Sequence, residues 1–151
     1  MKTKTILILS LILLPIAARP LWAAGAQTVT INAFDTMKFS VTKIEAKPGE
    51  KVTVELKNAG SLPKETMGHN WILLKAGSDA AAYAKASMEA RAQDYQPPSL
   101  AGEVLASIHL LGPKESAKTT FTAPSAPGSY PFLCSFPAHY QSGMRGTLIV
   151  K

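Results

Sequence analysis

The sequence contains a single cysteine, Cys134, among its 151 residues. An internal disulfide is therefore impossible, and an iron–sulfur cluster, which takes several cysteine thiolates, is excluded as well. No cysteine follows the N-terminal apolar segment, which excludes lipid attachment at an N-terminal cysteine. A lone thiol in an oxidising compartment would oxidise or pair with another chain unless it is buried and inert or bound by a metal.

Basic clusters, internal repeats and low-complexity tracts are also missing. The formal charge of +6 falls to +3 without Lys2, Lys4 and Arg19, which lie in the N-terminal segment. The remaining charges are scattered and never form a basic block interleaved with aromatic residues, so nucleic acid is not expected as a partner. The length suits one domain.

The first residues have the order of a secretory signal peptide: a positive start, an apolar run and small residues. These regions are Lys2 and Lys4, Ile6–Ala18 and Ala23–Ala26. We predict a signal peptide over residues 1–26, export to the periplasm and a mature domain over residues 27–151, without stable membrane insertion. Cleavage after Ala24 is an alternative. An uncleaved membrane anchor is disfavoured because two prolines and an arginine within residues 15–20 interrupt a longer span.

The mature chain consists mainly of short β-rich runs separated by turn residues. Apolar residues alternate in 28–34 and 51–57, which indicates strands with one buried face, and the continuous apolar run 69–74 indicates a strand buried on both faces. Further strands are predicted over residues 39–46, 103–111, 117–121, 129–134 and 146–150. This pattern predicts an all-β fold, an antiparallel sandwich or small barrel.

One segment, residues 79–92, predicts a short helix because it is rich in alanine and lacks glycine and proline. Ser78 or Asp79 is expected to cap it. Ala82, Ala86 and Arg91 have helical spacing, and Tyr83 is expected to anchor one side to the sandwich surface.

The C-terminal part carries the residues most suggestive of chemistry. Cys134, His139 and Met144 follow one another with four residues between each pair, in a loop that joins two predicted strands. His69 begins its own strand 65 residues before Cys134. Each residue alone has an ordinary structural explanation, but together they form a metal-ligand set. His109 has no such neighbours and is expected at the surface.

Two imidazoles, a thiolate and a thioether suit copper in both oxidation states. A trigonal His₂Cys site with a weak axial methionine is the blue-copper electron-transfer arrangement. Zinc prefers four strong tetrahedral ligands, for which a thioether is a poor choice.

The stretches around these residues resemble the azurin branch of the blue-copper proteins, the cupredoxins, with auracyanin close by. The similar segments are Leu62-Pro63-Lys64, Met67-Gly68-His69-Asn70-Trp71, Cys134-Ser135-Phe136-Pro137-Ala138-His139, Arg145-Gly146-Thr147-Leu148 and the spacing of Asp35, Met37 and Phe39. The resemblance implies a Greek-key β-sandwich of about eight strands with a helical insertion. It also implies His69, Cys134 and His139 as equatorial ligands and Met144 as the axial ligand.

Other residues gain roles from the same resemblance. The Gly68 carbonyl is expected near the metal, and Asn70 is expected to tie the two ligand segments together and, with Phe136, to donate an amide hydrogen bond to the thiolate. Two departures stand out: the azurin disulfide is missing, and four rather than three residues separate His139 from Met144. Asn58 replaces a buried azurin histidine, so no pH-linked switch is expected there.

The resemblance implies a non-enzymatic carrier of single electrons with one copper ion. His139 is expected to reach the surface within an apolar patch, where c-type cytochromes or periplasmic oxidoreductases would dock briefly. The expected patch consists of Met37, Leu62, Met67, Phe136, Pro137 and Ala138. The alternatives are a copper chaperone or storage protein, a fragment of a multicopper enzyme, for which three histidines are too few, and a purely structural module.

Overall fold

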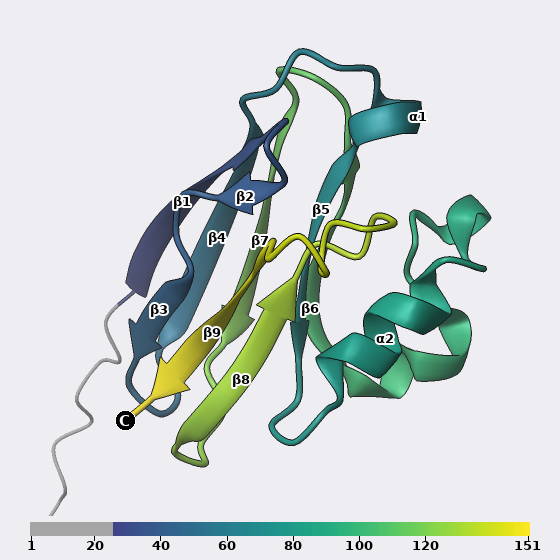
Figure 1. The fold of residues 1–151 in the computed structure, drawn as a ribbon. Helices are drawn as coiled ribbons and strands as arrows, with labels where there is room; N and C mark the ends of the chain where they lie inside the picture. Colours follow the sequence, from purple (N-terminus) through teal and green to yellow (C-terminus); the bar gives the residue numbers. More distant parts are fainter. Residues whose placement is uncertain (1–25) are drawn as a thin grey trace, which may run out of the picture.

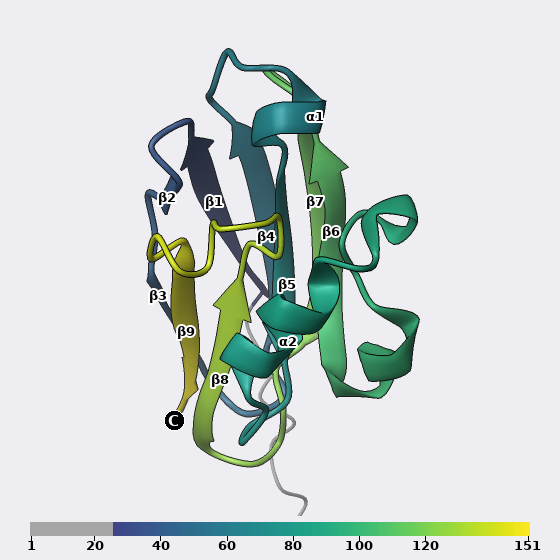
Figure 2. The same cartoon turned by 45° about the vertical axis from the view of Figure 1, so that its right-hand side comes forward.

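The computed structural model of the protein describes residues 26–151. The predicted signal peptide lies outside the described residues, except for Ala26, which begins the first strand. Two β-sheets pack face to face, with a helical segment on one side (Figures 1 and 2). No helix within residues 26–151 is long and apolar enough to cross a membrane.

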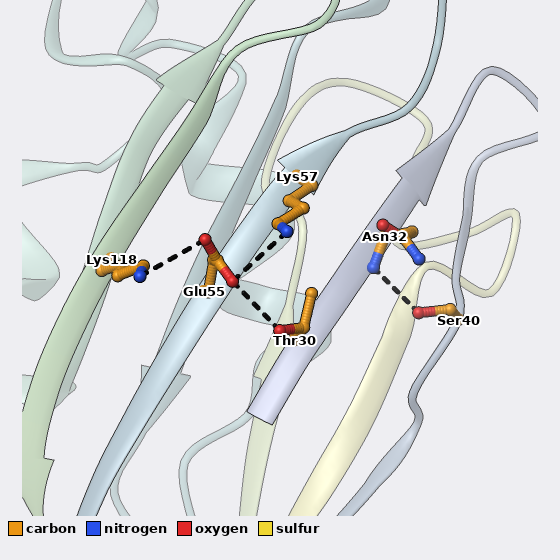
Figure 3. A network of polar contacts seen from close by, with 6 residues as sticks. All are labelled: Thr30, Asn32, Ser40, Glu55, Lys57 and Lys118. Carbon is orange, nitrogen blue, oxygen red and sulfur yellow. Dashed lines mark hydrogen bonds and ion pairs between the residues drawn. The ribbon is translucent and has the colours of Figure 1, made fainter. Parts of the chain in front are cut away.

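The first sheet has four strands in the order β2-β1-β4-β7. Its strands are β1 (Ala26–Phe34), β2 (Lys38–Phe39), β4 (Lys51–Asn58) and β7 (Ser116–Thr122). The predicted alternation is confirmed, because Val52, Val54 and Leu56 point inward and are fully buried. On the outer face, Glu55 accepts a hydrogen bond from Thr30 at 3.0 Å and lies 3.5 Å from two lysine ammonium groups (Figure 3). Such exposed ion pairs stabilise a fold only slightly, so this face is an ordinary solvated one.

The second sheet has five strands in the order β3-β9-β8-β5-β6. Its strands are β3 (Lys43–Ala46), β9 (Arg145–Val150), β8 (Gly128–Leu133), β5 (His69–Leu74) and β6 (Val104–Leu111). Every residue of β5 is buried, as predicted from its continuous apolar sequence. One face of β5 packs into the sandwich and the other is covered by the helical segment.

The sandwich is not wholly antiparallel, which corrects one detail of the prediction. β1 pairs with β4, and β3 with β9, in parallel. The predicted strand 39–46 is divided, because the chain leaves the first sheet after β2 and enters the second at β3. After β1, the chain returns through β2 and β3 before it enters β4. β1 and β4 therefore run in the same direction in the first sheet.

The helical insertion is confirmed but shorter than predicted. α2 spans Ala80–Ser87, and Asp79 caps it by accepting hydrogen bonds from two backbone amides. Tyr83 is buried as expected, together with Ala84 and Ser87, whereas Ala82 is exposed and Ala86 is half-buried. Two 3-10 helices, Arg91–Gln93 and Pro98–Glu103, continue the insertion, and a four-residue helix α1 (Lys64–Met67) precedes β5.

Candidate metal centre

His69 is fixed at the first position of β5. Its side chain is fully buried, and it pairs in register with Leu111 of β6. Gly68, just before it, ends α1 in an extended conformation. A Cβ on Gly68 would lie 2.6 Å from the Lys64 carbonyl oxygen and 2.9 Å from Leu110 Cγ. Only glycine fits this close approach. The backbone just before His69 is therefore packed against Lys64 and Leu110.

The other candidate ligands lie in the loop between β8 and β9. Cys134 follows the last residue of β8, and its amide donates to the Met144 carbonyl at 3.0 Å. The Met144 amide in turn donates to the His139 carbonyl at 2.9 Å, and the His139 amide to the Phe136 carbonyl at 3.1 Å. These bonds fold the loop into consecutive turns, which brings its three candidate side chains to one end of the sandwich.

The structure brings His69, Cys134 and His139 together. One ligand atom from each lies within 4.8 Å of the others, and all three residues are buried. Cys134 Sγ is 3.3 Å from His139 Nδ1, and the centroids of the two imidazole rings are 4.9 Å apart. Both ring nitrogens of His69 are buried without a hydrogen-bond partner among the described residues. Buried polar atoms normally have partners, so this arrangement fits a bound metal ion.

Burial controls the protonation of the three groups in the metal-free protein. It lowers the pKa of His69 to about 4, with Asp35 acting in the opposite direction, and lowers the pKa of His139 to about 4. It also raises the pKa of the Cys134 thiol to about 12, although the backbone amides of Asn70 and Phe136 donate to the sulfur and oppose this shift. Neutral imidazoles are ready to coordinate, whereas the thiol would release its proton as a metal binds.

Asn70 joins the two ligand-bearing segments. Its side-chain oxygen accepts from the Ser135 amide at 2.8 Å, and its side-chain nitrogen donates to Ser135 Oγ and to the Asp94 carbonyl, both at 2.8 Å. Ser135 Oγ donates to the Tyr95 carbonyl at 2.6 Å. The expected tie between β5 and the ligand loop is therefore present, and it extends to the helical insertion.

Two methionines flank the group. Met144 is fully buried in the main core with Cys134, and its backbone bonds to both Cys134 and His139. Met67 precedes His69 by two residues and is half-buried. Two imidazoles, one thiol and a nearby thioether form a soft donor set that fits copper better than zinc or calcium.

The expected apolar patch is present in part. Leu62 and Ala138 are exposed, and Met37, Met67 and Pro137 are half-buried. The expectation that His139 reaches the surface is wrong for this conformation, since only 1% of the residue is exposed. Phe136, also expected in the patch, is 8% exposed because its ring packs against His139 and Tyr95, at centroid distances of 4.7 and 4.9 Å.

Asp35 supports the region around the site, a role that the sequence analysis did not assign to it. One carboxylate oxygen accepts from the amide and hydroxyl of Ser61 at 2.8 and 3.2 Å, and the other is buried against Gly60. The backbone amides of Ser61 and Leu62 hold the pKa of Asp35 below its usual range against the effect of burial. Asp35 thus anchors the loop that carries Leu62. Its spacing with Met37 and Phe39 was the available clue.

The structure also places two further residues named in the sequence analysis, His109 and Asn58. His109 is exposed on β6 and takes no part in the cluster. Asn58 is buried, donates to the Leu111 carbonyl at 3.2 Å and accepts from the Gly60 amide at 2.9 Å. Its role is to hold a strand end.

Comparison with known proteins agrees with this geometry. Residues 26–151 match the family described as copper binding proteins, plastocyanin/azurin family. Azurin of Pseudomonas chlororaphis is 38% identical over 127 residues, which cover 82% of this chain and 97% of that protein. Auracyanin-B of Chloroflexus aurantiacus is 35% identical over 127 residues, but the 83% of this chain that aligns spans only 52% of the relative.

The solved structure of auracyanin A from Chloroflexus aurantiacus, described as a "blue" copper protein, has a TM-score of 0.74 and 34% identity, covering 84% of this chain and all of that one. The cupredoxin-like fold, the copper cofactor and the class of non-enzymatic electron carrier predicted from the sequence are confirmed. The chain belongs to the plastocyanin/azurin family of copper-binding proteins.

Proposed function

We propose that the protein carries single electrons between redox proteins of the periplasm, using one copper ion held by His69, Cys134, His139 and Met144. The convergence of two imidazoles and one thiol within 4.8 Å supports this proposal most directly. Copper supplies the one-electron chemistry by alternating between Cu(II) and Cu(I). The protein's contribution is a buried, prearranged ligand set that excludes water and requires little rearrangement in either state.

The division of roles follows from the surroundings of each ligand. His69, Cys134 and His139 are proposed as the trigonal plane. Met144 is proposed as the axial ligand, since it is fully buried and bonded through its backbone to two of the three. The Gly68 carbonyl is proposed as a weak contact on the other side. The amides of Asn70 and Phe136, which donate to the Cys134 sulfur, would stabilise the thiolate and tune the reduction potential.

Residues 1–26 are proposed as a cleaved signal peptide and residues 27–151 as the mature copper-binding domain. Export also suits the single cysteine, because the buried and metal-bound thiol of Cys134 would be protected from oxidation. The proposed partners are c-type cytochromes or periplasmic oxidoreductases, which would dock at the apolar patch over His139.

Titration of metal-free protein with Cu(II), followed by visible spectroscopy, tests the function. One equivalent should produce an intense thiolate-to-copper absorption band, and Cys134→Ser should abolish it. The copper-loaded protein should then oxidise a reduced c-type cytochrome in stopped-flow measurements. Tight Cu(I) binding without the band would instead favour a chaperone or storage protein and would overturn the proposal.

A pair of matched variants tests the axial ligand. Met144→Leu should raise the reduction potential, because loss of the thioether donor disfavours Cu(II) more than Cu(I), whereas Met67→Leu should leave the potential close to that of the unmodified protein. Voltammetry and the visible spectrum report both effects. The opposite pattern would assign the axial position to Met67.

A further inference from the structure

Two cationic side chains contact the ligand loop and its end. Lys38 Nζ donates to the Ser142 carbonyl, and a Cβ on Gly143 would lie 2.8 Å from that nitrogen. The Arg145 guanidinium lies over the Tyr140 ring, 4.7 Å from its centroid. Both residues are exposed, and they border Gly143 and Met144. We call Lys38 and Arg145 the cationic flank.

No carboxylate neutralises the cationic flank within residues 26–151. Every ion pair there involves Glu45 or Glu55, and neither Lys38 nor Arg145 takes part in one. The ligand loop itself, residues 134–144, contains no aspartate, glutamate, lysine or arginine. The two positive charges therefore remain available to a docking protein beside the ligand loop.

Other charged side chains near the ligand loop do not make its surroundings negative overall. A hollow of about 110 Å³ beside Phe136 is lined by two cations, Lys64 and Arg91, and by one carboxylate, Glu65. Asp94 is half-buried and accepts from the amide of Leu110, which also lines this hollow, at 3.4 Å. Asp35 is engaged with Ser61 on the side of the patch near Leu62. The charges beside Phe136 are thus of both signs, whereas the cationic flank has no carboxylate partner.

Resting on the proposed function, we infer that the electron-transfer partner of this chain is a redox protein with carboxylates around its exposed cofactor edge, and that these carboxylates face Lys38 and Arg145. An apolar contact of small area gives brief binding but little orientation. Charges at its rim govern the rate of encounter and the orientation of docking, with a strong dependence on salt. Two positive charges beside the ligand loop, without a carboxylate partner, would therefore select an acidic partner and orient it across the loop.

The test is stopped-flow electron transfer between the copper-loaded protein and two c-type cytochromes, one acidic and one basic around the haem edge. For the acidic cytochrome, the second-order rate constant should fall as salt is raised. In the double variant Lys38→Gln/Arg145→Gln it should fall roughly three- to tenfold at low salt and lose much of its salt dependence. The basic cytochrome should react faster with this variant than with the unmodified protein.

Matched controls separate docking from folding. Lys51→Gln/Lys75→Gln removes the same charge from two exposed residues far from the ligand loop. Lys51 begins β4, and Lys75 follows the end of β5 that is remote from His69. This variant should change the rates less than twofold. Arg145→Lys keeps the charge and should keep the rate. An unchanged visible spectrum and reduction potential would show that each variant retains its copper site.

Two results would overturn the inference. One is a rate with the acidic cytochrome that does not fall with added salt, and the other is an equal loss of rate in the Lys51→Gln/Lys75→Gln control. Failure of the proposed function would look different, because neither cytochrome would then be oxidised by the copper-loaded protein.

Discussion

Asn70 shows how a single buried side chain sets the distance between two parts of the site. Its amide group bonds to the ligand loop through Ser135 and to the insertion through Asp94. The Ser135 hydroxyl adds a second bond from the ligand loop to the insertion, at the Tyr95 carbonyl. The Asn70 carboxamide, together with the pairing of β5 and β8 next to Cys134, therefore fixes the separation of His69 from Cys134.

Replacing Asn70 by alanine should lower the free energy of unfolding by about 2–4 kcal/mol, because two buried hydrogen bonds and one partly buried hydrogen bond are lost. Ser135→Ala is the control. It keeps the bond from the Ser135 amide to Asn70 Oδ1 and should cost less. Urea unfolding of the metal-free variants measures both effects. Equal losses would show that Asn70 contributes no more than the Ser135 hydroxyl.

At the residue scale, the grouping of ligands was predictable, but their exposure was not. Cysteine, histidine and methionine on one loop bind few metals other than copper, so residue types alone indicated the chemistry. The burial of His139 depends on Phe136, whose ring is held by Tyr95 from the insertion. Such a contact between distant segments has no counterpart in local sequence.

At the scale of elements, the junction between α1 and β5 places His69. α1 lacks a side-chain cap at its start and has no buried residue, so it contributes little stability of its own. The close packing of Gly68 against Lys64 and Leu110 holds it in place.

Gly68→Ala should therefore destabilise the protein by about 1–3 kcal/mol, since the added methyl group has to displace backbone. It should also weaken copper binding by shifting His69. Gly102→Ala is the matched control, because a Cβ there meets nothing within 4 Å. Thermal unfolding and copper titration of both variants provide the comparison, and a Gly68→Ala protein as stable as the control would refute this account.

Strands were easier to predict than the insertion. Alternation and continuous apolar runs identified β4 and β5 because burial dictates both patterns. The helix predicted over 79–92 ends at Ser87, where a side-chain bond to the backbone competes with helical bonding and turns follow. Ser87 Oγ donates to the Tyr83 carbonyl at 2.8 Å, and Asp94 and Tyr95 adopt positive φ values of 55° and 60°. These turns direct Asp94 to Asn70 and Tyr95 to Phe136.

At the scale of the whole molecule, the metal site links stability to pH. Burial lowers the pKa of both His69 and His139 from 6.5 to about 4. The unfolded chain thus binds protons that the folded, metal-free protein does not. The stability is fully present above pH 6.5 and is lost as the pH falls from 6.5 through 4.

Urea midpoints measured between pH 4 and pH 7.5 should fall steeply on the acid side for metal-free protein. Copper-loaded protein should resist this fall until the metal dissociates, because coordinated nitrogens cannot take up protons. His69→Gln should reduce the slope by removing one of the two groups. A metal-free protein whose midpoint stays constant across this range would contradict the assignment.

The architecture as a whole was predicted correctly as a sandwich with an insertion, but its parallel pairs were not. Local alternation determines which face of a strand is buried and carries no information about the direction of its neighbour. The pairing of β1 with β4 depends on the crossing of the chain between sheets at residues 40–42.

This crossing also places Ala26 and Lys151 at the same end of the sandwich, opposite the ligand loop (Figure 1). β1 starts there, and β9, which begins beside Met144, ends there. A linker or an affinity tag at either end of the domain would leave the copper face free. The protein is therefore suited to oriented immobilisation on an electrode, with its electron-exchanging end toward the solution.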